Sequence, residues 1–102
     1  MLQTYTVALT VRPPTVDYDP ERVGRMAARF ASYLPDGSQT LRINAAVEGE
    51  GGIAARVPAA TAARALHAVA TALELAAAEE PEGVEGLGDV SRAVVELDGP
   101  AD

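Results

Sequence analysis

The sequence contains no cysteine, no lysine and no tryptophan, and it contains one histidine, one phenylalanine and three tyrosines. Without cysteine the chain forms no disulfide, has no thiol nucleophile and offers no cysteine ligand to zinc. The single histidine, His67, excludes a histidine-rich metal site within one chain. So few aromatic rings make no platform for stacking nucleic-acid bases. We therefore predict no cofactor and no metal.

Positive charge is also scarce, and the shortage lies in the second half of the sequence. All eight basic residues are arginines against 15 acidic residues, which gives a net charge of −7. Residues 1–58 carry six arginines and six acidic residues, whereas residues 59–102 carry two arginines and nine acidic residues. This charge disfavours nucleic acid and anionic membranes as partners, although a local patch of arginines can override it.

Long apolar runs are absent as well. The most apolar long stretch, residues 59–78, is interrupted by Arg64, His67 and Glu74, so we expect no membrane span. A strand-like segment occupies the place of a signal peptide's apolar region. We therefore expect a soluble cytoplasmic protein. The 21 alanines, and arginine as the only basic residue type besides His67, are typical of GC-rich bacterial genes.

Hydrophobic periodicity predicts four strands and two helices in a single domain over residues 1–98, with a frayed tail at 99–102. Strict alternation indicates the strands, and apolar stripes bounded by caps and prolines indicate the helices. The predicted order is strand 3–11, helix 20–34, strand 39–48, strand 53–57, helix 59–80 and strand 91–97. This order predicts an α+β fold, the ferredoxin-like βαββαβ plait, in which a four-stranded antiparallel sheet carries two helices on one face.

The glycine-rich segment GEGG at residues 49–52 allows two interpretations. A phosphate-binding loop needs glycines that lead directly into a helix, but here a strand separates them from the next helix. We therefore interpret the segment as the tip of a hairpin between the second and third strands. The alternation then predicts a register that pairs Val47 with Ile53. It also pairs Ala45 with Ala55.

Three arginines, Arg22, Arg25 and Arg29, recur at helical spacing on one side of the first predicted helix. Such a ridge can meet phosphates or an acidic partner. The alternative is an ordinary solvated helix face.

The strand alternation also leaves one face of the sheet to solvent or to another molecule. Its side chains are small and mixed in character: Thr4, Thr6, Ala8, Thr10, Arg42, Asn44, Ala46, Ala54, Arg56, Arg92, Val94 and Glu96. A surface of this kind can support sheet-to-sheet dimerisation or partner binding, and Val94 is its most interface-like member. The alternative is a solvated sheet face.

Two further features have plain interpretations. His67 is predicted to be exposed on the second helix, and its alternative role as a general base lacks a nucleophile at a suitable spacing. The acidic residues between Glu79 and Asp89 do not have the ligand spacing of a calcium loop. We expect a solvated acidic loop, with docking of a basic partner as the alternative.

These observations favour a non-enzymatic binding or regulatory module that acts through protein–protein contacts and forms a homodimer or binds a protein partner. The candidate interaction residues are Arg22, Arg25, Arg29, Arg42, Arg56 and Val94. The alternative is a small dimeric α+β enzyme, or a small-molecule-binding protein, with a pocket between sheet and helices. Tyr5 and His67 would be its test residues. A third possibility, nucleic-acid binding through the arginine ridge, predicts a steep dependence on salt.

Overall fold

The computed structural model of the chain describes residues 2–11, 20–44, 51–79 and 90–100. Its elements are β1 (Gln3–Val11), α1 (Pro20–Tyr33), β2 (Gln39–Asn44), β3 (Gly51–Ala59), α2 (Ala62–Ala78) and β4 (Val90–Pro100). This is the predicted order of strands and helices, and it confirms an α+β protein.

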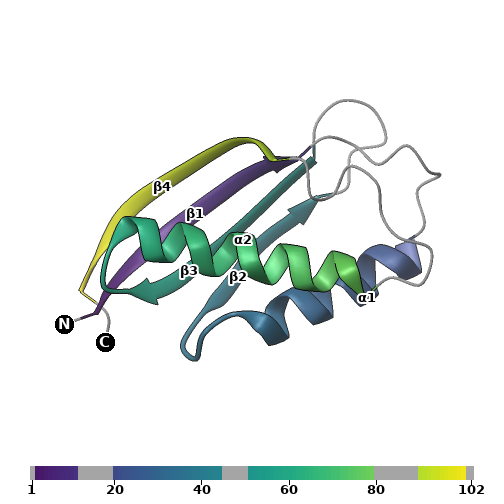
Figure 1. The fold of residues 1–102 in the computed structure, drawn as a ribbon, viewed down its shortest axis with the longest axis horizontal. Helices are drawn as coiled ribbons and strands as arrows, with labels where there is room; N and C mark the ends of the chain where they lie inside the picture. Colours follow the sequence, from purple (N-terminus) through teal and green to yellow (C-terminus); the bar gives the residue numbers. More distant parts are fainter. Residues whose placement is uncertain (1, 12–19, 45–50, 80–89, 101–102) are drawn as a thin grey trace.

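The strands form an open four-stranded antiparallel sheet in the order β2-β3-β1-β4 (Figure 1). Strands β1 and β3 lie in the middle, where each has a partner on both sides. β2 and β4 form the two edges. In Figure 1, α2 lies across the sheet and α1 lies beside α2.

The core lies between the sheet and the helices. Alternate residues of β1, namely Tyr5, Val7 and Leu9, are buried on the face that contacts the helices. Phe30 of α1 is 1% exposed and packs into the same cluster. The other buried members come from β3 and α2: Ile53, Ala55, Val57, Ala59, Ala65, Val69, Ala72, Leu73 and Ala76. The period of two along β1 therefore defines a buried face and an outer face, as the sequence predicts.

The helix boundaries follow local signals in the sequence. Pro20 is the first residue of α1, where its missing N–H group costs no hydrogen bond. After α1, the backbone N–H of Ser38 donates to the carbonyl oxygen of Pro35 at 3.2 Å, and Gly37 adopts a φ of 85°. Only glycine takes this left-handed conformation without steric cost, so this turn is encoded locally. Thr61 caps α2, since its hydroxyl oxygen accepts the backbone N–H of Arg64 at 3.2 Å.

The predicted hairpin register is wrong. Ile53 lies opposite Ile43, and Ala55 lies opposite Thr40. The partner of Ile53 is Ile43 instead of Val47, four residues earlier in the sequence. A register shift at Leu41, which has no partner in β3 and is 41% exposed, adds one residue to this offset at Ala55. An extra residue of this kind reverses the phase of the alternation, so the residues before it change faces.

In the edge strand β4, the residues predicted to face the core do lie on that face of the sheet, but they are less buried than predicted. Ala93, Val95 and Leu97 lie opposite Leu9, Val7 and Tyr5, so they belong to the buried face of the sheet. Yet Leu97 is 59% exposed, Ala93 is exposed, and only Val95 is half-buried. β4 also extends to Pro100, three residues beyond the predicted strand end. The edge of the sheet therefore carries apolar side chains that the helices leave partly exposed.

Candidate functional site

The outer face of the sheet has a small apolar row at its centre. In this row Val94 lies opposite Ala8, and Ala8 lies opposite Ala54. Arg42 lies at one end of this row, because it lies opposite Ala54 on the edge strand β2. Neighbouring strands lie about 4.8 Å apart, so the three apolar residues span about 10 Å. Val94 is 37% exposed, whereas Ala54 is only 8% exposed.

Charged and polar side chains lie on one side of this row. Glu96, Thr6, Arg56 and Gln39 lie side by side across the four strands. Two of these side chains, Thr6 and Arg56, contact a third residue, Asp98. The Thr6 hydroxyl donates to a carboxylate oxygen of Asp98, and Arg56 Nε lies 3.3 Å from the same oxygen.

Asp98 reaches these partners because of a bulge in β4. Thr4 lies opposite Gly99 and Tyr5 lies opposite Leu97, which leaves Asp98 as the extra residue. The side chains of Arg56 and Asp98 remain 47% and 32% exposed. Ion pairs at this exposure contribute little to stability, so the pair defines the charge of the surface more than it stabilises the fold.

The opposite side of the apolar row also carries arginines. Arg92 lies opposite Thr10, and Thr10 lies opposite Gly52. The guanidinium of Arg42 lies over Gly52, since a Cβ atom added to Gly52 would be 3.0 Å from an Arg42 nitrogen. The outer face is thus a short apolar row flanked by exposed arginines and carboxylates.

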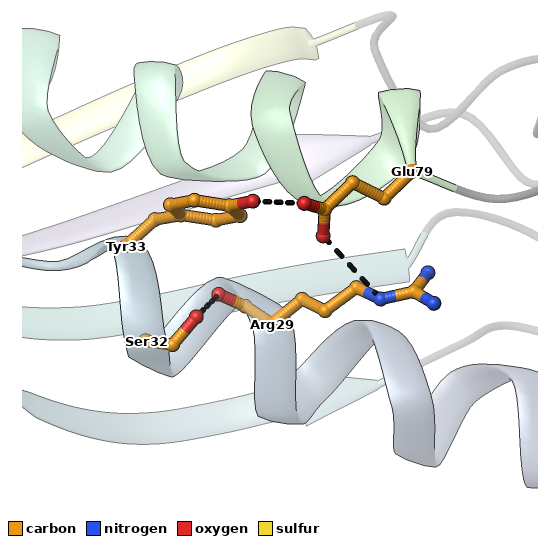
Figure 2. A network of polar contacts seen from close by, with 4 residues as sticks. All are labelled: Arg29, Ser32, Tyr33 and Glu79. Carbon is orange, nitrogen blue, oxygen red and sulfur yellow. Dashed lines mark hydrogen bonds and ion pairs between the residues drawn. The ribbon is translucent and has the colours of Figure 1, made fainter.

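The three arginines of the ridge predicted on the first helix differ in what the structure shows of their surroundings. Figure 2 shows that Arg29 reaches from α1 toward Glu79 at the end of α2, and Arg29 Nε lies 3.4 Å from Glu79 Oε2. Arg25 is exposed on α1. The side chain of Arg22 lies outside the described part of the structure. A binding ridge therefore stays a prediction, and Arg29 forms an exposed ion pair with the C-cap residue of the other helix.

Tyr33 strengthens the same helix–helix contact. Its hydroxyl donates to Oε1 of Glu79, the C-cap residue of α2 (Figure 2). The neighbouring Ser32 hydroxyl donates to the carbonyl oxygen of Arg29 at 2.7 Å. The hydrogen bond to Glu79 raises the pKa of Tyr33 above its ordinary value, because only the neutral phenol can donate. Desolvation and the negative charge of Glu79 raise the pKa further, and Arg29 opposes them.

The remaining candidate residues do not come together. His67 is exposed on α2, as predicted. Tyr5 is 8% exposed in the core, and its hydroxyl donates to Gln3 Oε1 at 3.3 Å. Gly51 and Gly52 belong to β3, and α2 begins only at Ala62, so these glycines do not lead into a helix. The other residues of the predicted hairpin tip and of the acidic loop after Glu79 lie outside the described residues.

Over the residues that the structure describes, no group of three or more histidine, cysteine or acidic side chains could hold a metal ion. Neither described helix has the length and apolar character that crossing a membrane requires. No protein-family model, curated protein or solved structure matches the chain.

Proposed function

We propose that this chain is a non-enzymatic binding module that acts through protein–protein contacts and functions as a homodimer. We assign the contacts to the outer face of the sheet, with Val94, Arg42 and Arg56 as contact residues. The observation that carries the proposal is the apolar row at the centre of this face. A row of small residues flanked by charges offers area for protein contact and no enclosed space for a small substrate.

The fold supports this assignment. We propose that the chain adopts the ferredoxin-like plait, in which one sheet face packs on both helices and the other is available to a partner. The element order βαββαβ and the strand order β2-β3-β1-β4 support this topology. The absence of cysteine is in keeping with a reducing compartment, and we propose a cytoplasmic location.

The alternative, a small enzyme or small-molecule-binding protein, needs a pocket between sheet and helices. In the described part of the chain, large side chains fill this layer: Phe30, Leu9, Val7, Val57 and Val69 are all buried. Tyr5 lies in the core and His67 is exposed, so these two do not form one site. The binding module is therefore the better supported function.

Sedimentation equilibrium tests the proposal. We expect the wild-type protein to dimerise at high micromolar concentration and Val94→Glu to weaken the dimer, because a carboxylate would replace the apolar centre of the contact. Leu75→Glu is the matched control. Leu75 is 44% exposed, close to the 37% of Val94, but it lies on α2. The proposal fails if the wild-type protein is a strict monomer, or if Leu75→Glu weakens the dimer as much as Val94→Glu.

A further inference from the structure

The edge strand β4 is long, exposed on both faces and open along one side. It runs from Val90 to Pro100 and is the last strand of the sheet, so no described strand pairs with its second side. Val94 on the outer face is 37% exposed, and Leu97 on the buried face is 59% exposed. A row of open backbone N–H and C=O groups beside exposed apolar side chains is a template for pairing with another strand.

The other edge of the sheet is less suited to pairing. β2 has six residues, and the register shift at Leu41 interrupts its ladder with β3. Irregularity and shortness are the features that protect an edge strand from further pairing. In β4, the register shifts lie near Ser91 and Asp98, which leaves a regular segment from Arg92 to Leu97.

Symmetry restricts how two copies of β4 can pair. Two identical edge strands pair in antiparallel fashion about a twofold axis perpendicular to the sheet, and both outer faces then lie on the same side. Residues directly opposite each other in such a ladder must share a face. The pairing must therefore be centred on one residue that lies opposite its own copy.

The charges of β4 select one centre. Arg92, Val94 and Glu96 share the outer face, because they lie opposite Thr10, Ala8 and Thr6 of β1. A centre at Arg92 or at Glu96 places like charges opposite each other, which is unfavourable. A centre at Val94 places Arg92 opposite Glu96 of the second copy, and it does so twice.

The remaining centres pair charges less well. A centre at Ala93 leaves Arg92 opposite the apolar Val94 of the second copy. A centre at Val95 leaves Glu96 opposite that Val94. On the buried face, the centre at Val94 also brings Ala93 opposite Val95, so small and branched apolar side chains meet there.

We propose that the partner of this module is a second copy of the same chain, joined through antiparallel β4–β4 pairing centred on Val94. The two sheets become one sheet of twice the width, and two Arg92–Glu96 pairs flank the twofold axis on its outer face. This inference rests on the proposed homodimer and places the dimer contact at the β4 edge, so Val94 is part of the contact, whereas Arg42 on β2 and Arg56 on β3 lie away from it on the outer face. The outer faces of the two copies then form one continuous surface, with Val94 at its middle.

Charge reversal tests the register. Arg92→Glu and Glu96→Arg each replace two attractive cross-strand pairs by two repulsive ones, so we expect each to raise the dimer dissociation constant by about tenfold or more. An equimolar mixture of the two variants restores opposite charges at both positions and should form the heterodimer in native mass spectrometry. The double variant Arg92→Glu/Glu96→Arg should restore the homodimer. Arg64→Glu, at an exposed position on α2, changes the net charge as Arg92→Glu does and should leave the dimer intact.

The outcomes separate this inference from the proposed function. Loss of the dimer in both single variants, with recovery in the mixture and in the double variant, supports pairing centred on Val94. A wild-type dimer that tolerates Arg92→Glu overturns the β4 pairing but leaves the homodimer standing. Loss in the single variants without recovery in the mixture also overturns the register. A wild-type protein that is monomeric at every concentration overturns both proposals. Circular dichroism spectra confirm that each variant is folded.

Discussion

Replacement of Phe30 by alanine should remove a large share of the stability of this domain. Phe30 is 1% exposed and is the largest fully buried side chain among the described residues. It joins α1 to a core that is otherwise built from the sheet and α2. Truncation of a buried phenylalanine to alanine costs about 3–5 kcal/mol, from lost transfer free energy and from the cavity that remains. At about 0.05–0.15 kcal/mol per residue, a chain of 102 residues has a total stability of about 5–15 kcal/mol.

Urea unfolding followed by circular dichroism measures this loss. All variants are compared at one protein concentration, because self-association adds a concentration-dependent contribution to stability. Leu75→Ala is the control, since Leu75 is 44% exposed and should lose about 1 kcal/mol at most. If Phe30→Ala lost no more free energy of unfolding than Leu75→Ala, the packing of α1 against the sheet would be wrong.

Two further predictions concern the helices. Glu79→Gln should lower the pKa of Tyr33 toward its ordinary value, because the variant lacks the negative charge that favours the neutral phenol. Absorbance titration at alkaline pH, with Tyr33→Phe to identify the signal, measures this pKa, and an unchanged value would contradict the contact. Since the pKa of Tyr33 is raised in the folded state, the contact stabilises the fold below the unfolded pKa, and this contribution is lost as the pH rises through the folded pKa. Thr61→Ala should lower the free energy of unfolding by about 1 kcal/mol, because it removes the N-cap of α2. Thr61→Asp should lose less, because aspartate also caps helices. Equal losses in urea unfolding for the two variants would show that the cap contributes nothing.

Local signals in the sequence predicted most of the elements of this fold. The alternation from Gln3 to Val11 gave the full extent of β1, and Pro20 marked the start of α1. The apolar stripe of α1 correctly identified Met26 and Phe30 as buried. Each of these features depends on neighbours within one turn or one strand, so a sequence pattern is sufficient to reveal it.

The register of β2 and the depth of β4 depend on other parts of the chain. An uninterrupted alternation from residue 39 to 48 gives no sign of the extra residue at Leu41, so the sequence pattern assigned Thr40 to the wrong face. For β4 the alternation identified the correct face but could not say how far the helices extend over the edge. The alternation shows which face of the sheet a side chain lies on. It does not show whether another element covers that side chain, and Leu97 at the edge of the sheet stays 59% exposed.

The polar contacts of the candidate site could not be predicted because their members are distant in sequence. Tyr33 and Glu79 are 46 residues apart, and Arg56 and Asp98 are 42 residues apart. The sequence pattern places Asp98 beyond the end of the last strand, yet the bulge in β4 brings its carboxylate to Thr6 and Arg56. No spacing rule links such pairs, since only the strand order brings them together.

The most direct test of the central claim is a dilution series of amide chemical shifts by NMR, from millimolar to micromolar protein. Our account predicts that the concentration-dependent shifts concentrate along β4 and on its outer-face neighbours, above all Val94 and Ala8. Shifts confined to α1 and α2, or spectra that do not change with concentration, would contradict the claim that this protein acts as a homodimer through the outer face and edge of its sheet.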